Sequence, residues 1–298
     1  MFLRIFKFCL TAGLLLFMQS CSHQEEDGSV SGDGFVKVTG CTVSGTVSGS
    51  DVFIAGRTVI IPSLLVCDHE VTQKEYYAVM GTKPSSDSSS VASVESQENH
   101  PVEILSWYDC LVYCNKRSLA EGLTPCYTIS DKTNPSDWGT VPIINNSTWN
   151  VATCNFNANG YRLPTEAEWE YLARGGNISN RGQSIYSGSN MIDDVAWYNE
   201  NSGFKTHEVK KKKANSLGLY DMCGNAWEWC WDWGGTITST TPSTGVASGS
   251  KRVLRGGSWY RNADTCTIQH RETVYPYTRN ASPGVGGNNF GLRLVRSE

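Results

Sequence analysis

The chain has 298 residues and is mildly acidic, with 25 lysines and arginines against 29 aspartates and glutamates, a formal net charge of −4 at pH 7. This balance excludes the electrostatic footprint of a protein that binds nucleic acid. Aromatic residues make up 11% of the chain and there are 29 glycines, which is typical of an irregular, loop-rich domain. The sequence has no internal repeat, heptad pattern or second hydrophobic span, so we expect no solenoid, coiled coil or transmembrane bundle.

The first twenty residues have the pattern of an export signal. Arg4 and Lys7 precede an apolar run over 9–18, about half the roughly 20 residues that a membrane span needs. A small residue directly before Cys21 resembles a bacterial lipobox, whose cysteine is lipidated. We therefore expect residues 1–20 to be a lipoprotein signal peptide that leaves the protein anchored in the cell envelope, at the outer surface of a bacterium. The alternatives are an ordinary cleaved signal and a short uncleaved anchor.

Residues 21–50 are rich in serine, glycine, threonine and acids. Such a segment buries too little apolar surface to order itself, so we expect a flexible tether followed by one domain over 51–298. Two of the eleven cysteines, Cys9 and Cys21, belong to the leader and the lipobox, which leaves an odd number in the exported part. At least one thiol is therefore unpaired, and the pairing of the others stays open.

Three helices are predicted by the same signals, a capping hydroxyl with an acid three residues later and a glycine at the far end. Their residues are Thr72, Glu75 and Gly81; Ser106, Asp109 and Gly122; and Thr165, Glu168 and Gly175. Ser106 and Asp109 depart from a strict capping box because the acid is aspartate, which is shorter than the usual glutamate or glutamine. Short strands are expected at 51–53, 58–61, 64–67, 252–255 and 291–295.

Four motifs occur one after another toward the C-terminus. They are GYRLPTEAEWEYLARGG from Gly160, NSLGLYDMCGNAWEWCWDW from Asn215, RVLRGGSWYRNADTC from Arg252 and FGLRLVR from Phe290. Together they resemble the formylglycine-generating enzyme family, the sulfatase-modifying-factor domain. The resemblance implies an α+β fold, a single irregular, loop-rich C-type-lectin-like domain of the formylglycine-generating-enzyme type with few short helices and strands.

Charged residues within these motifs have structural roles in our interpretation. Arginine is a planar, permanently charged donor that ties loop carbonyls to carboxylates. We expect this of Arg162, Arg255 and Arg293, and we expect Glu166, Glu168 and Glu170 to serve as buried ion-pair partners rather than as catalysts.

The family resemblance implies a calcium ion at the segment LYDMCGNAWEW. Asp221 and Glu228 would supply carboxylates, and Gly224 and Ala226 would supply backbone carbonyls. Oxygen ligands from a tight loop suit a hard cation, whose role here would be structural. The alternative is a turn in which Asp221 caps local amides and Glu228 pairs with an arginine.

Active members of the family use two cysteines five residues apart to hold copper and activate oxygen, because soft thiolates select Cu(I). Here Arg261 stands at the first position and Cys266 at the second. A guanidinium cannot supply a thiolate, so we expect no copper centre. Cys266 would be the catalytic residue only if the chain is an enzyme.

The remaining cysteines and histidines show no CxxC pair, HExxH motif or clustered spacing. We expect His69, His100, His207 and His270 to have structural roles. Cys110 and Cys114 share a helix face, and Cys223 and Cys230 flank GNAWEW. For these we expect disulfide or core roles rather than a metal site.

A polar, tyrosine-rich segment separates RGGSW from the terminal GLRLVR. Tyrosine provides large contact area at low entropic cost, and short polar side chains provide adaptable hydrogen bonds. The segment resembles the C-terminal variable region of proteins diversified by retroelements, so we expect a variable binding region over 258–296. Its expected ligand-binding residues are Tyr260, Arg261, Asn262, Asp264, Thr265, Gln269, His270, Glu272, Thr273, Tyr275 and Tyr277.

These observations favour a monomeric, lipid-anchored surface protein that binds a macromolecular ligand, expected to be a protein, without chemistry. Two alternatives stay open. One is a formylglycine-generating or related copper- and oxygen-dependent oxidase that acts on a protein cysteine. The other is an envelope scaffold with a fixed partner. Fold resemblance alone does not choose among them.

Overall fold

A computed structural model of the protein describes residues 34–85, 95–179, 181–279 and 289–298. The predicted signal peptide over 1–20 and the predicted lipidation site Cys21 lie outside these residues, as does part of the predicted binding region. Among the helices of the described ranges, none combines the length and the hydropathy that a membrane crossing requires.

Three helices begin where the capping signals predict. The side chains of Thr72, Ser106 and Thr165 each accept a hydrogen bond from the backbone amide of the acid three residues later. The carboxylate of that acid in turn accepts a hydrogen bond from the backbone amide of the capping residue. Asp109 completes its box although it is shorter than glutamate. The helices are α1 Gln73–Met80, α2 Trp107–Ala120 and α4 Glu166–Ala173. The predicted glycines Gly81, Gly122 and Gly175 follow them with φ of 69°, 70° and 65°, in the left-handed region.

The remaining helices of the described residues are single turns. They are the α-helices α3 Ser147–Asn150 and α5 Ile192–Val195 and the 3₁₀ turns η1 Gln97–Asn99, η2 Pro135–Asp137 and η3 Ala263–Cys266. With so few regular elements, the fold is α+β and loop-rich, as expected.

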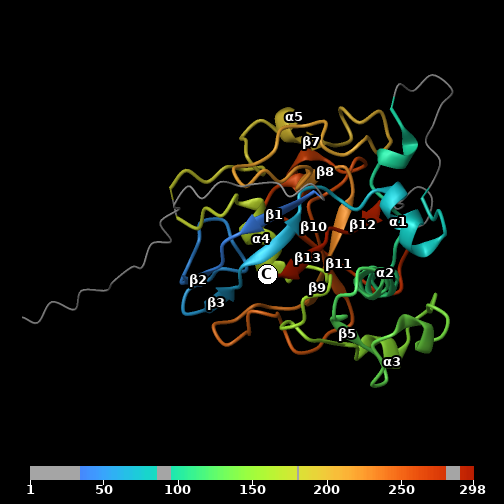
Figure 1. The fold of residues 1–298 in the computed structure, drawn as a ribbon. Helices are drawn as coiled ribbons and strands as arrows, with labels where there is room; N and C mark the ends of the chain where they lie inside the picture. The colour runs from blue at the N-terminus through green and yellow to red at the C-terminus, as the bar shows by residue number, and fades with distance from the viewer. Residues whose placement is uncertain (1–33, 86–94, 180, 280–288) are drawn as a thin grey trace, which may run out of the picture.

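A four-stranded sheet lies at the centre of the molecule, with strand order β11-β10-β9-β12. Its strands are β9 Trp227–Trp233, β10 Arg252–Arg255, β11 Arg271–Val274 and β12 Phe290–Gly291. β10 pairs antiparallel with both β9 and β11, whereas β12 runs parallel to β9. Figure 1 shows β2 and β3 at one side of the molecule and α2 and α3 at the other.

A three-stranded sheet and three pairs complete the strands of the described ranges. The sheet has the order β1-β4-β13, from β1 Phe35–Val38, β4 Leu64–Cys67 and β13 Val295–Ser297. The pairs are β2 Cys41–Ser44 with β3 Thr58–Ile61, β5 Tyr127–Thr128 with β6 Thr153–Cys154, and β7 Ala196–Trp197 with β8 Cys223–Gly224. The strand expected at 51–53 is wrong, because these residues form a bend, and the one expected at 291–295 is divided between β12 and β13.

The predicted tether over 21–50 is too long, because residues 35–44 form strands of the domain. Phe35, Val36 and Val38 are buried, and β1 pairs antiparallel with β4. The segment is ordered by partners that lie far along the chain, and local composition does not reveal such pairing.

Buried arginines join the loops to helices and strands, as expected. Arg162, Arg255 and Arg293 are each 0% exposed, yet each has a carboxylate within ion-pair distance. Because an unpaired buried charge is costly, these pairs fix the relative positions of distant segments. The pairs are Arg162 with Glu168 at 2.7 Å, Arg255 with Glu170 at 2.6 Å and Arg293 with Glu228 at 2.7 Å.

Candidate ligand-binding face

The segment that follows β10 runs along one edge of the four-stranded sheet. It leaves β10 after Arg255, passes through η3 and returns as β11, which places Arg255 opposite Arg271. β11 is the last strand at its end of the sheet order among the described residues. The predicted binding residues therefore lie on an outer strand and on the loop that leads into it.

All eleven predicted binding residues are at least partly exposed. Tyr260 and Tyr275 expose 37% and 45% of their surface, while Cys266, Thr267 and Ile268 between them are buried. The segment thus has a buried support and an outward polar surface. We call the eleven residues the candidate face; they are Tyr260, Arg261, Asn262, Asp264, Thr265, Gln269, His270, Glu272, Thr273, Tyr275 and Tyr277.

The tyrosines of the candidate face make two different aromatic groupings. Tyr275 and Tyr277 stack with ring centroids 5.5 Å apart and planes 19° apart, and Lys251 lies 5.4 Å from the Tyr275 centroid. Tyr260 instead lies 6.3 Å from the ring of Phe204. Stacked, partly exposed rings offer a rigid apolar surface to a ligand.

The loop that carries Phe204 is a part of this surface that the sequence analysis missed. Phe204 exposes 67% of its surface and has a left-handed φ of 61°, which is uncommon for a bulky residue. The amide of Asn199 donates to the carbonyl of Arg261 at 3.0 Å, and its side-chain amide donates to Asn262 Oδ1 at 2.6 Å. No local sequence signal connects this loop to a segment some sixty positions later.

A pocket of about 500 Å³ opens beside the candidate face. Asp264, Gln269 and His270 line it from the face, and residues of the 46–51 loop line it from the other side. Burial lowers the pKa of His270, so its imidazole is held toward the neutral form. Residues 46–50 fall in the segment predicted to be tether, which is why sequence reasoning did not find this wall.

Two arginines, Arg271 and Arg279, anchor the segment to helices α4 and α2. Arg271 donates to both carboxylate oxygens of Glu166 in α4, at 2.8 and 2.7 Å. Arg279 donates to both oxygens of Asp109 in α2, at 2.7 and 2.8 Å. Because two-bond pairs of this kind fix orientation as well as distance, the candidate face is held on a rigid support.

The positions that would hold copper do not fit a two-sulfur centre. Cys266 is buried, and burial raises the pKa of its thiol to about 12. Arg261 holds the partner position and is only half-buried. Burial also raises the pKa of the Cys223 thiol, so neither cysteine is readily converted to the thiolate that copper would need.

The predicted calcium segment contains two buried acids, Asp221 and Glu228, and a third buried acid, Glu70, joins them around the guanidinium of Arg293. Glu228 accepts from Arg293 and from the indole of Trp169, so both of its oxygens are in use. Asp221 accepts from the amide of Lys210 through Oδ2, whereas its buried Oδ1 has no hydrogen-bond partner. Glu70, which the sequence analysis missed, has its pKa raised well above the ordinary value, first by burial and then by these two acids.

These contacts match the alternative in which Asp221 caps an amide and Glu228 pairs with an arginine. Of the two predicted carboxylate ligands, only Asp221 keeps an oxygen, Oδ1, that is open to calcium. Calcium at this segment stays a prediction, and no functional step is derived through it.

Residues 21–298 match the sequence profile of the sulfatase-modifying factor enzyme 1-like domain. The chain belongs to this family. The chain is 37% identical to the chaperone protein LppX of Paenibacillus barcinonensis, over 88% of this chain and 95% of that one. It is 35% identical to the formylglycine-generating enzyme of Streptomyces coelicolor, of which it spans only 52%.

The fold of this chain is similar to that of several solved structures, one of which is a variable protein. Treponema denticola variable protein 1 superposes with a TM-score of 0.74 at 39% identity, over 89% of this chain and 95% of that one. The structure titled CarF superposes with a TM-score of 0.64 at 26% identity, over 89% and 98% of the two chains. The fold expected from the four motifs is thereby confirmed.

Proposed function

We propose that this protein is a lipid-anchored protein of the bacterial cell envelope that binds a protein ligand through the candidate face. The observation that carries the proposal is the contrast within 260–279. Its eleven outward residues are exposed or half-buried, while the segment that carries them is fixed by Arg255, Arg271 and Arg279. Such a surface can change its contacts without disturbing the core.

Likeness to Treponema denticola variable protein 1 supports the finer part of the proposal, that the candidate face is diversified by a retroelement. The test is to sequence the 3′ end of the gene in several isolates and to search its neighbourhood for a near-repeat of the region that encodes 258–296. Differences concentrated at adenine-containing codons of the eleven face residues are expected. A constant segment with no repeat would refute diversification and favour the fixed-partner scaffold.

One observation keeps an enzymatic alternative in view. Cys266 occupies the second of the two cysteine positions that the family resemblance implies for the enzyme, and it is a buried free thiol. Oxygen consumption by the reduced, copper-loaded protein with a cysteine-containing peptide separates the two functions. Turnover that disappears in Cys266→Ser would establish the oxidase and overturn the purely binding role.

A further inference from the structure

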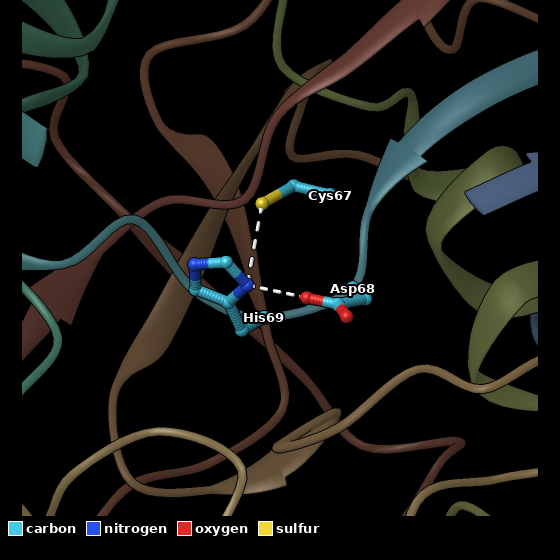
Figure 2. A group of neighbouring side chains, drawn as sticks. All are labelled: Cys67, Asp68 and His69. Atoms are coloured by element: carbon cyan, nitrogen blue, oxygen red, sulfur yellow. Dashed lines mark hydrogen bonds and ion pairs between the residues drawn. The ribbon is translucent and has the colours of Figure 1, made fainter. Parts of the chain in front are cut away.

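Three consecutive residues at the end of β4 bring a sulfur, a nitrogen and an oxygen together. The Sγ of Cys67 lies 3.7 Å from Nδ1 of His69, and the same nitrogen is hydrogen-bonded to Oδ1 of Asp68. All three ligand atoms lie within 4.8 Å of one another. Figure 2 shows the thiol and the carboxylate both directed at Nδ1, from two sides of the imidazole ring.

The second ring nitrogen of His69 and the second carboxylate oxygen of Asp68 also have polar partners. Nε2 of His69 faces Oε2 of Glu75 at 3.4 Å, and Oδ2 of Asp68 accepts from Nζ of Lys210 at 2.6 Å. Histidines that bind metal generally donate their other ring nitrogen to a carboxylate, which fixes the tautomer and the ring orientation. The arrangement around His69 has this form, with Nδ1 turned to the cluster and Nε2 turned to the carboxylate.

The backbone that carries the cluster is fixed on both sides. The amide of Cys67 donates to the carbonyl of Leu294 and the amide of Asp68 donates to that of Gly34, each at 2.9 Å. The carbonyl of Cys67 accepts from Nη1 of Arg293 at 3.0 Å. Because this backbone is fixed, binding an ion requires movement of the side chains alone: the ion has to displace the proton between Nδ1 of His69 and Oδ1 of Asp68 and to separate these two atoms.

We propose that Cys67 Sγ, Asp68 Oδ1 and His69 Nδ1 form a binding site for a zinc-class divalent ion, with the fourth position left to water. Thiolate and imidazole select zinc and similar transition metals over calcium and magnesium, which prefer oxygen alone. The side chain of His69 is 14% exposed, so the cluster is reachable from solvent. This site is distinct from the predicted calcium segment and from the Arg261 and Cys266 positions.

The location of the site indicates a structural role. The site joins the end of β4 to Gly34, the first described residue. A Cβ atom added at Gly34 would lie 3.3 Å from Cε1 of His69. It also reaches the start of α1 through Glu75. The ion would therefore stabilise the point at which the N-terminal segment enters the domain.

The test uses the full mature chain, stripped with EDTA, kept reduced and titrated with Zn²⁺ alone or Co²⁺ alone. We expect binding of one ion per chain by calorimetry, a rise in the melting temperature and a thiolate-to-cobalt charge-transfer band. Cys67→Ser should lose that band, and His69→Gln should lose most of the zinc affinity. Cys41→Ser, which removes a half-buried cysteine outside the cluster, is the matched control and should behave as the parent chain.

A further variant keeps the proposal testable if Cys67→Ser fails to fold. Glu75→Gln preserves the capping box of α1, because glutamine also accepts at that position. It should retain the cobalt band but bind zinc roughly 10- to 100-fold more weakly, the usual loss for a partner of a ligating histidine. Absence of a cobalt band in the parent chain, persistence of the band in a folded Cys67→Ser, or unchanged zinc affinity in Glu75→Gln would overturn the proposal.

Discussion

Nη1 of Arg255 donates a 2.7 Å hydrogen bond to the carbonyl oxygen of His270, from a guanidinium that is itself 0% exposed. The same nitrogen reaches the carbonyl of Gln269 at 2.9 Å, and Nη2 pairs with Glu170 at 2.6 Å. One buried side chain therefore connects helix α4 to the backbone of two residues of the candidate face. The candidate face therefore rests on a buried support in which a substitution would disturb several contacts at once.

Replacing Arg255 should destabilise the fold and the face together. Arg255→Met removes one partner of a buried ion pair, and such a loss costs about 3–5 kcal/mol of unfolding free energy. Denaturant unfolding measures this directly. Arg181→Met, at an exposed arginine, is the matched control and should change stability by less than about 0.5 kcal/mol. Equal effects in the two variants would contradict the role given to Arg255.

Removing the stacked tyrosines should separate binding from stability. The double variant Tyr275→Ala, Tyr277→Ala should bind the ligand at least roughly 30-fold more weakly, because central aromatic anchors contribute about 2 kcal/mol or more. Tyr275→Ala alone should leave the melting temperature close to that of the parent because Tyr275 is exposed, whereas Tyr277 is partly buried against the core and its loss should lower the melting temperature. Tyr77→Ala, at a tyrosine on α1 that exposes 50% of its surface, is the control for ring removal. Unfolding of the double variant would show that the two rings support the core instead.

The thiol of Cys266 should be inert in the folded protein. Burial raises its pKa to about 12, so it is protonated at neutral pH and withdrawn from solvent. Iodoacetamide labelling followed by mass spectrometry should modify the half-buried Cys41 first and Cys266 only after unfolding. Rapid modification of native Cys266 at neutral pH would point back to a reactive, enzyme-like cysteine.

Asp221 should make stability depend on pH. Burial raises its pKa to about 6, so the folded state binds this proton more tightly than the unfolded state does. The contribution to stability is therefore fully present below the ordinary pKa of about 4 and is lost as the pH rises through about 6. Asp221→Asn removes this dependence and should raise the melting temperature at neutral pH without calcium. Asparagine suits the left-handed φ of 55° at this position.

The same variant tests the calcium prediction. If calcium binds through Oδ1 of Asp221, added calcium should raise the melting temperature of the parent chain and leave that of Asp221→Asn unchanged, and chelation should reverse the rise. Identical calcium responses in the two proteins would remove Asp221 from any calcium site.

Cys21 should carry the lipid. Growth with a labelled fatty acid should label the parent chain, and Cys21→Ala should abolish both the label and retention in the membrane fraction. A membrane-retained but unlabelled Cys21→Ala would instead support the uncleaved anchor, since the apolar run over 9–18 would then remain attached.

Local signals along the chain were sufficient for the helices and for the family. Each capping hydroxyl at Thr72, Ser106 and Thr165 acts on an amide only three residues away, so its effect is readable without the fold. The exposure of the candidate face was also predictable, because its tyrosines and short polar residues differ from the apolar framework on either side.

Long-range contacts were not predictable in the same way. Phe204 lies against Tyr260, the 46–51 loop lines the pocket with His270, and β1 completes a sheet from within an expected tether. The sequence by itself determined a loop-rich domain through its composition, a known family through its four ordered motifs, and a polar outer segment between the last two of them. Only the tertiary structure decided which distant loops share that surface, and which distant residues, Lys210 and Arg293 among them, surround Cys67, Asp68 and His69. The reason is that those contacts depend on the path of the backbone between the residues and not on the residues themselves.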